Sequence, residues 1–259
     1  MNGKQHYYAG IDAGSRAVKA LIWDGESVIG RSIVPTGWTP GESIRLAYRT
    51  ALQAAGIVRT DRVTATGYGR IVAPFADLRV TEITAHARGI SRLIPGIRTL
   101  IDVGGQDSKA ILLDEDGVVT DFAMNDRCAA GCGKFLEFLA LTLGLTMEDF
   151  AELAYSSNCP TVISSICTVF AETEALSLVA EGVPREDVAA GAHRSIASRV
   201  AQLAQSLNPE PPVAFTGGVG RNRCMVRELS KALGMEIVVP DLPEFTGAFG
   251  AAIIASEGL

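Results

Sequence analysis

The chain has 259 residues, a formal net charge of −6 and 47% hydrophobic residues. This length can hold one large domain or two smaller ones, with enough apolar content for a substantial core. The acidic balance argues against nucleic acid as a principal partner, and no apolar run approaches the ~18–20 residues that span a bilayer.

The cysteines and the N-terminal residues indicate the compartment. The N-terminal residues lack the charged-then-apolar pattern of a signal peptide, so we expect a cytoplasmic protein with no membrane partner. Five cysteines, an odd number, favour free thiols or metal ligation over a disulfide framework in such a protein.

Strands and helices are expected to alternate along the chain. In the first part we predict a hairpin over 7–24, a third strand within 25–34, a helix over 42–56, a strand over 63–67 and a helix over 81–93. The second part is expected to contain a hairpin from 98, a strand over 118–122, helices over 135–143, 147–155, 167–181 and 188–207, a strand over 213–216, a helix over 226–233, a strand over 236–239 and a helix over 246–256.

The two parts follow the same order, βββαβα, which indicates two α/β lobes with a cleft between them. We place the boundary near residues 95–96. Residues 1–95, joined by the C-terminal helix 246–259, are expected to form the N-terminal lobe. Residues 96–245 are expected to form the C-terminal lobe.

One segment of the sequence occurs twice. Ile11–Asp24 is repeated at Ile101–Asp114 without a gap, and the Ile, Asp, Gly, Lys, Ala and final Asp positions coincide. Each copy has an apolar strand ending in an acid, a small-residue turn and a second strand, a pattern typical of a hairpin whose tip offers backbone N–H groups to an anion. Two such hairpins would clamp the phosphates of a nucleotide, with Asp12 and Asp102 placed to hold a hydrated metal ion.

A third glycine-rich turn, Thr216–Gly220, follows a predicted strand. Its small residues would let a flat adenosine lie against the backbone, with Asn222 available for a hydrogen bond. Neither a GxxxxGK[ST] sequence nor a Rossmann glycine fingerprint after the first strand is present, which disfavours those nucleotide-binding folds.

The order of phosphate, phosphate and adenosine elements resembles the superfamily of acetate and sugar kinases, Hsp70 and actin. Two further segments, Asn125–Leu136 and Ser164–Glu172, closely resemble the activators of 2-hydroxyacyl-CoA dehydratases. These are the BadF/BadG/BcrA/BcrD-type ATPases, related to the ATP-binding subunits of benzoyl-CoA reductase. Ala65–Arg70 and Glu82–Gly89 fit the same family, so the resemblance covers essentially the whole chain and implies two ribonuclease H-like α/β lobes with a nucleotide cleft.

The resemblance also implies an activity and its cofactors. Members couple hydrolysis of ATP, bound with Mg²⁺, to transfer of a single low-potential electron to a dehydratase or reductase partner, after reduction by ferredoxin or flavodoxin. One [4Fe–4S] cluster is shared by the two subunits of a homodimer, with Cys128 and Cys167 as the ligands in each chain. Both cysteines lie just ahead of or at the start of a predicted helix, where free N–H groups stabilise thiolates. Since such a cluster takes four thiolates, two chains related by two-fold symmetry complete it.

Roles for the remaining candidate residues follow from the repeats. Asp12 and Asp102 are expected to hold Mg²⁺ through water, and Gln106 or Asp107 to orient the attacking water. Lys19 is expected to support the first hairpin or the phosphates, or to share a structural role with Lys109, the equivalent residue of the second copy. The phosphate-binding candidates are Ala13, Gly14, Ser15, Arg16, Gly104, Gly105 and Gln106. The adenosine-binding candidates are Gly217, Gly218, Val219 and Asn222.

Other titratable residues are given plainer roles. Cys132 departs from the family pattern and is either a spectator or an alternative ligand. Cys159 and Cys224 are expected to be structural or surface thiols. A solvated helix face is expected for His193, and surface positions for the charged side chains of Arg194 and Arg199.

Four alternatives remain open from the sequence. Within the family, the chain could be a benzoyl-CoA reductase-type ATPase subunit or serve a double-cubane cluster protein. From other classes, it could be a small-molecule kinase of the same superfamily, without a cluster, or a regulator that binds ATP with negligible turnover. The paired cysteine segments argue against the last two.

Overall fold

The computed structural model describes residues 5–164 and 167–258, which form two compact units. The first contains the chain through Ile97, the turn Leu113–Thr120 and the chain from Glu244 onward, and the second contains Arg98–Leu112 and Asp121–Pro243. The lobes expected from the sequence, with the C-terminal helix joining the N-terminal lobe, remain a prediction. Within the two described ranges, no helix has both the length and the apolar composition to cross a membrane.

The first unit is built on a five-stranded sheet with the order β3-β2-β1-β4-β5. β2 is antiparallel to both β1 and β3, while β4 runs parallel to β1 and β5 parallel to β4. The strands are β1 (Tyr8–Ala13), β2 (Ala17–Trp23), β3 (Val28–Pro35), β4 (Arg62–Thr66) and β5 (Leu78–Arg79). The helices are α1 (Pro40–Ala55), α2 (Glu82–Leu93) and α8 (Thr246–Glu257).

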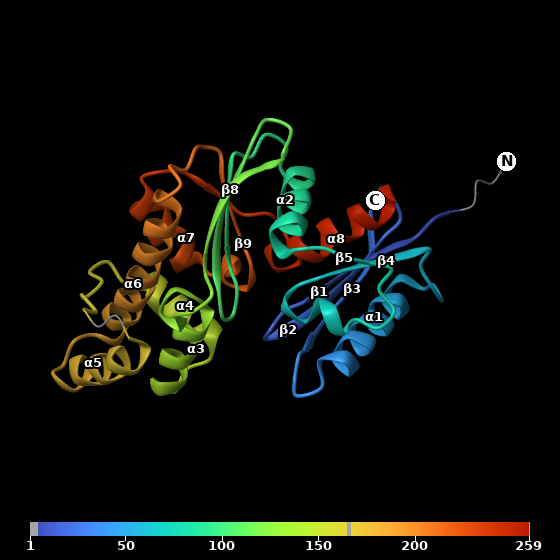
Figure 1. Cartoon of the computed structure of the whole chain (residues 1–259). Coiled ribbons are helices and arrows are strands. Elements are labelled where there is room, and N and C mark those ends of the chain that lie inside the picture. Colours follow the sequence, from blue (N-terminus) through green and yellow to red (C-terminus); the bar gives the residue numbers. More distant parts are fainter. Residues whose placement is uncertain (1–4, 165–166, 259) are drawn as a thin grey trace. The chain divides into compact units, whose positions relative to one another are not determined.

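The alternation of side chains along β1 places helices on both faces of this sheet (Figure 1). Ile11 lies in one core cluster with Ile44 of α1. Gly10 lies against the backbone of α8, where a Cβ would overlap the carbonyl of Ala248. The central strand is therefore covered on both sides, as its almost continuous apolar sequence predicts.

The second unit contains a five-stranded sheet with the order β10-β9-β6-β7-β8, the same pattern of sequential neighbours. Its strands are β6 (Thr99–Val103), β7 (Ser108–Leu113), β8 (Val119–Asn125), β9 (Val213–Thr216) and β10 (Ile237–Val238). Its helices are α3 (Gly133–Thr142), α4 (Met147–Ser156), α5 (Thr168–Ala180), α6 (Arg185–Gln205) and α7 (Arg223–Leu233). The core joins the sheet to these helices through buried aromatic residues, including Phe135, Phe150 and Phe215.

The repeat visible in the sequence extends beyond the two hairpins. In each sheet the acid near the end of the first strand lies opposite a lysine on the antiparallel neighbour and beside a threonine on the parallel neighbour. These sets are Asp12 with Lys19 and Thr66, and Asp102 with Lys109 and Thr216. The predicted fold class, α/β with two ribonuclease H-like lobes, is confirmed.

A glycine in the left-handed region follows the parallel strand in each unit. Gly67 has φ 90° and Gly217 has φ 87°, and a Cβ on them would overlap the backbone of Ala13 and Val103, respectively. Each glycine leads into a short 3₁₀ helix, η1 (Tyr68–Val72) or η3 (Gly218–Arg221). Only glycine combines this φ with such a close approach, so the turn holds the end of the parallel strand against the end of the first strand.

Substitution of Gly217 should be much more harmful than substitution of its neighbour. We expect Gly217→Ala to lower the free energy of unfolding by about 2–4 kcal/mol, because strained backbone is added to a steric overlap with β6. A Cβ on Gly218 meets no atom within 4 Å, so Gly218→Ala is the matched control and should change stability little. Urea denaturation of both variants measures the difference, and equal stability would contradict the role of the turn.

Candidate functional site

The tip of the first hairpin is held by hydrogen bonds from the residue that follows β3. The Lys19 Nζ lies 3.1 Å from Asp12 Oδ2 across the hairpin, and the Asp12 side chain is almost fully buried. Thr36, just after β3, donates its hydroxyl to Gly14 O at 2.7 Å, and its amide donates to Arg16 O. Ser15 and Arg16 lie exposed at the tip. The turn thus offers an exposed tip on a fixed base.

The second hairpin carries one more carboxylate. Lys109 is 2% exposed, and its Nζ lies 3.7 Å from Asp102 Oδ2 and 2.6 Å from Asp107 Oδ2. Asp102 also accepts a hydrogen bond from the Thr216 hydroxyl at 2.9 Å. Asp107 corresponds to Ala17 in the first hairpin, so the second hairpin carries an acid at this position that the first hairpin lacks.

The tip of the second hairpin is bonded to the start of α3. Gly133 N donates to Gly104 O at 2.9 Å, and Lys134 N donates to Gly105 O at 2.8 Å. Gln106, the next residue, is exposed. A change in the backbone of this tip would therefore act directly on the first turn of α3.

The third glycine-rich turn includes η3, between β9 and α7. Gly218 has open space where its Cβ would be, while Val219 packs into the core. A groove of about 520 Å³ borders this turn and is lined by Gly220, Arg221 and side chains of α7. On its wall, the guanidinium groups of Arg223 and Arg227 lie 4.3 and 4.9 Å from the Tyr155 ring centroid.

Asn222 has an internal role that the sequence interpretation did not assign. Its Oδ1 accepts from Met225 N at 3.0 Å and caps α7, and its Nδ2 lies 2.9 Å from His193 Nε2. The side chain is 8% exposed. The carbonyl and one amide hydrogen that were expected to be available for adenosine are thus engaged inside the second unit.

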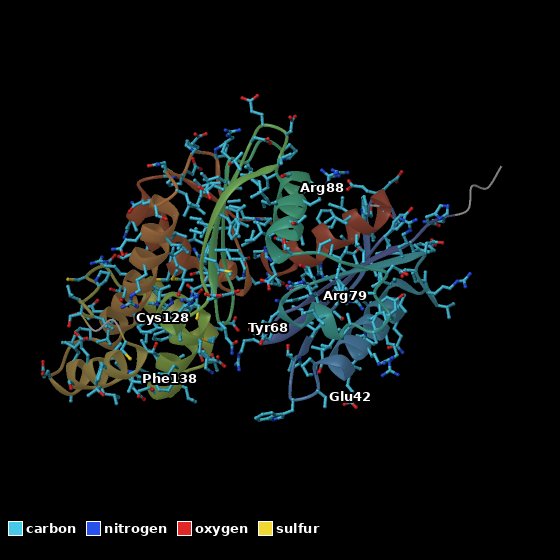
Figure 2. The ribbon with its side chains drawn as sticks, viewed as in Figure 1. Glu42, Tyr68, Arg79, Arg88, Cys128 and Phe138 are labelled. Carbon is cyan, nitrogen blue, oxygen red and sulfur yellow. The ribbon has the colours of Figure 1, made fainter. Side chains whose placement is uncertain are left out.

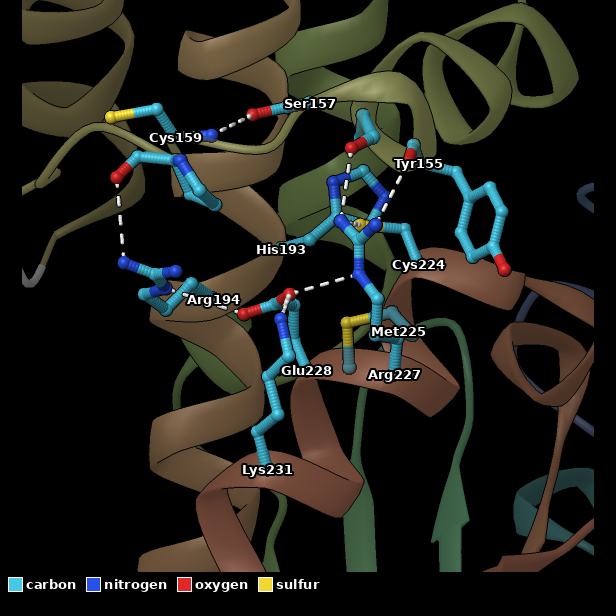
Figure 3. A network of polar contacts seen from close by, with 12 residues as sticks. Tyr155, Ser157, Cys159, His193, Arg194, Cys224, Met225, Arg227, Glu228 and Lys231 are labelled. Atoms are coloured by element: carbon cyan, nitrogen blue, oxygen red, sulfur yellow. Dashed lines mark hydrogen bonds and ion pairs between the residues drawn. The ribbon is translucent and has the colours of Figure 1, made fainter.

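The prediction of a solvated His193 is wrong. The residue is fully buried on α6, because the neighbouring Ala189, Ala190, Gly191 and Ala192 are small enough to let other elements approach the helix. Burial lowers its pKa to about 4, so the ring is neutral at physiological pH. Figure 3 shows His193 among side chains of α4 and α7.

Arg194 also differs from its expected role as a simple surface charge. Its Nε lies 3.2 Å from Glu228 Oε2, and Glu228 is buried while also contacting Arg227 and Lys231 (Figure 3). Burial alone would raise the pKa of Glu228, but hydrogen bonds from Lys231 and Arg194 outweigh it and hold the pKa below its usual value. A buried carboxylate with three cations therefore joins α6 to α7.

Arg199 is likewise more than a surface charge. Its Nη1 donates to Ala130 O at 2.8 Å, and its guanidinium lies 5.5 Å from the Phe135 ring centroid. Ala130 lies in the 3₁₀ helix η2 (Ala129–Gly131), which begins just after Cys128. This arginine therefore fixes the backbone beside a candidate cluster ligand.

Cys128 and Cys167 are both exposed (Figure 2 labels the former). Cys167 is the N-cap residue of α5, as the sequence predicted. Cys128 instead precedes the three-residue η2, and the N-cap of α3 is Cys132. The short helix η2 thus separates Cys128 from α3, which the sequence pattern did not predict. Asn125 fixes Cys128 by accepting from its N at 3.2 Å and donating to its O at 2.9 Å.

The remaining cysteines differ in accessibility. Cys132 is fully buried, its thiol donates to Ala129 O, and burial raises its pKa. Cys224 is also buried, with a pKa raised to about 11 chiefly by burial. Cys159 is exposed. Since thiolates bind iron, the donor chemistry fits Cys128 and Cys167 and disfavours Cys132 as an alternative ligand.

Among residues 5–164 and 167–258, no group of three or more His, Cys, Asp and Glu side chains could hold a metal ion. Ser165 and Ile166, inside the second cysteine segment, lie outside the described residues.

Comparison with known proteins identifies the family. The model of the BadF/BadG/BcrA/BcrD ATPase family matches residues 9–255. The chain belongs to this ATPase family. The predicted resemblance is confirmed, and the ATPase class follows from it.

Three similar proteins match this chain along almost their full length. The activator of lactoyl-CoA dehydratase from Anaerotignum propionicum is 42% identical over 97% of this chain and 98% of its own. The crystal structure of the (R)-2-hydroxyglutaryl-CoA dehydratase component A from Acidaminococcus fermentans is 40% identical, with a TM-score of 0.94 and 98% of each chain covered. The activator of the 2-hydroxyisocaproyl-CoA dehydratase from Clostridium difficile, solved with bound ADPNP, is 38% identical, with a TM-score of 0.92 and 97% and 95% covered.

Several residues of this family member that organise the site escaped the sequence interpretation. Glu228 pairs with Arg194 of α6, and Arg227 donates to the Tyr155 carbonyl of α4. Asn125 accepts from Cys128 N in the adjacent turn. Only Asn222 carried a usable local signal, because Asn followed by a helix-forming segment is typical of an N-cap.

The Glu228 cluster should make stability depend on pH. Because the pKa of Glu228 is lowered in the folded state, its contribution is present above the usual value of 4.5 and is lost as pH falls through the folded-state pKa. We expect Glu228→Gln to lower the free energy of unfolding by about 2 kcal/mol at pH 7 and by less at pH 4. Urea denaturation at both pH values measures this, with Glu137→Gln, at a partly exposed pair with Lys134, as the control. An equal loss at both values would contradict it.

Proposed function

We propose that this ATPase is the iron–sulfur activator of a 2-hydroxyacyl-CoA dehydratase-type enzyme, to which it transfers a single low-potential electron coupled to ATP hydrolysis. The observation that carries the proposal is that Cys128 and Cys167 are both exposed in a chain whose family and relatives are activating ATPases. The electron donor is a ferredoxin or flavodoxin, and the protein acts in the cytoplasm.

The nucleotide is ATP, bound with Mg²⁺. The tip residues Ala13–Arg16 and Gly104–Gln106 would contact the phosphates, and Asp12 and Asp102 would hold Mg²⁺ through water. The ion pairs with Lys19 and Lys109 keep both carboxylates oriented at the ends of their strands. Gly217, Gly218 and Val219 would lie against adenosine, a role supported by the open space beside Gly218.

The water that attacks the terminal phosphate is assigned to Gln106. Of the two candidates, Asp107 is held by Lys109 at 2.6 Å, whereas the Gln106 side chain is exposed at the tip. An amide orients a water without removing its proton, which suits hydrolysis that depends on positioning and electrostatic stabilisation.

The [4Fe–4S] cluster would be held by Cys128 and Cys167 of each of two copies. Four thiolates complete such a cluster, and two-fold symmetry supplies the second pair. When bound, this group accepts and gives up one electron at low potential. Val162, Val169 and Phe170, near Cys167 in the sequence, are 73%, 61% and 68% exposed, which supports an interface with a second copy around the cysteines.

ATP hydrolysis would reach the cluster ligand through α3. The bonds from Gly133 N and Lys134 N to the second hairpin tie the start of this helix to the proposed phosphate site. Cys128 precedes η2, the short turn that leads into this helix, and Arg199 holds that turn. A rearrangement of Gly104–Gln106 on loss of the terminal phosphate would shift the backbone that carries the thiolate.

Iron content, ATP turnover and the enzyme activated distinguish this proposal from its alternatives. A benzoyl-CoA reductase-type subunit or the reductase of a double-cubane protein would share the cluster and differ in the enzyme activated. A small-molecule kinase would be free of iron and form ADP only with its substrate. A regulator would bind ATP with negligible turnover.

Iron analysis tests the cluster proposal. We expect about four irons and four acid-labile sulfides per dimer in anaerobically purified protein, lost in both Cys128→Ala and Cys167→Ala. Cys159→Ala is the matched control, since this thiol is also exposed and lies in the loop leading to Cys167. Iron-free wild-type protein, or a cluster retained in both variants, would overturn the proposal and favour the kinase.

Steady-state ATPase kinetics test the assignment of Gln106. Gln106→Ala should lower kcat by about 100-fold with little change in KM, because the water is no longer oriented. Asp107→Asn keeps an oxygen for Lys109 and should have a much smaller effect. The reverse ranking of the two variants would move the role to Asp107.

A further inference from the structure

Two buried side chains join α6 to the start of α7 in the second unit. His193 is fully buried and Asn222 is 8% exposed, and His193 Nε2 lies 2.9 Å from Asn222 Nδ2. His193 Nδ1 lies 2.7 Å from Ala189 O, and Asn222 Oδ1 accepts from Met225 N at 3.0 Å. The proposed cluster and hydrolysis steps use neither side chain.

The donors and acceptors in this chain of bonds have only one consistent direction. A carbonyl oxygen only accepts, so the proton of the neutral His193 ring must lie on Nδ1, facing Ala189 O. Nε2 is then an acceptor and takes a hydrogen from the Asn222 amide. With its NH₂ turned towards the ring, Asn222 presents Oδ1 to Met225 N. The tautomer of His193 therefore fixes the orientation of Asn222.

Asn222 in turn fixes the end of the glycine-rich turn. Its backbone N donates to Val219 O at 2.9 Å, and its side chain caps the helix that follows. At the other end of the turn, Gly217 N donates to Pro243 O at 3.0 Å. Between these two anchors lies Gly218, whose open side is the proposed adenosine contact.

We propose that His193 is a positioning residue for adenosine: through Asn222 it holds η3 in the conformation that binds the nucleoside, without touching the nucleotide itself. The inference rests on the proposed binding of ATP at this turn. It separates two parts of the nucleotide, because the phosphates are assigned to the hairpin tips and only the nucleoside depends on η3.

Two substitutions of His193 distinguish this role from general packing. His193→Gln can place an amide oxygen near the position of Nε2 and keep an acceptor for Asn222. His193→Asn can still donate to Ala189 O but is too short to reach Asn222. Both are neutral, polar and smaller than histidine, so both lose packing, and only the second loses the bond to Asn222.

The experiment is calorimetric binding of Mg²⁺-ADP and of inorganic Mg²⁺-tripolyphosphate to the cluster-loaded protein under anaerobic conditions. We expect His193→Asn to weaken ADP binding about tenfold, as the loss of one buried hydrogen bond would. His193→Gln should stay within about twofold of wild type, and tripolyphosphate should bind all three proteins alike. Each titration is run well below the melting temperature of the variant.

A second position keeps the test decisive if His193→Asn folds poorly. Asn222→Ser retains a side-chain oxygen for Met225 N but cannot reach His193, so it should weaken ADP binding by a similar factor. In the double variant with His193→Asn, the two losses should not multiply, because both remove the same bond.

The outcomes separate this inference from the proposed function. Equal ADP affinity in the two His193 variants, or an equal loss of tripolyphosphate binding in His193→Asn, would overturn the positioning role while leaving nucleotide binding intact. Failure of the wild-type protein to bind ADP would overturn both the proposed function and this inference.

Discussion

The pairing of an acid with a lysine across each hairpin is the constraint on which both units depend. Asp12 and Asp102 lie near the ends of the first strands, and both residues are buried. Burial of a carboxylate is energetically costly unless its charge is paired. Lys19 and Lys109 lie opposite them in the antiparallel register. The register of each hairpin thus places the lysine that holds the strand-end carboxylate beside the tip that would receive phosphates.

The two units have diverged around this shared constraint. In the second, Asp107 gives Lys109 a second carboxylate, and the tip is bonded to α3. Among the residues that the structure describes, four α-helices separate β8 from β9 there, whereas α1 is the one α-helix between β3 and β4 in the first unit. The cysteines and the buried Glu228 cluster lie in this helical insertion and in α7. The unit that carries the additional charge next to the proposed phosphate site is also the one that carries the proposed cluster ligands.

The sequence predicted most elements because strands and helices in this chain have clear periodicity, and the repeat at Ile11 and Ile101 identified the fold. It failed where tertiary contacts decide. His193 stands beside Arg194 and Ser195, and nothing local reveals that small residues on α6 admit α4 and α7 around it. The predicted start of α7 at Val226 was late because the signal at Asn222 was interpreted as a ligand contact, not as a helix cap.

The segments before the two proposed cluster ligands, Cys128 and Cys167, are contacted from different proposed nucleotide sites. The Gly104 and Gly105 carbonyls hold α3, with Cys128 just before it. The glycine-rich turn leads through α7 to Glu228, which pairs with Arg194, and Arg194 Nη1 lies 3.4 Å from Pro160 O in the loop before Cys167. A chain of contacts couples two sites only where one of its elements can adopt two arrangements. The first route meets this condition better, because a phosphate bound to the N–H groups of the tip would act on the same short backbone segment whose carbonyls hold α3. The second route is locked by a buried carboxylate with three cations, which suits a fixed support for the loop at Pro160. Electron release from the proposed cluster would then be controlled on the side of Cys128.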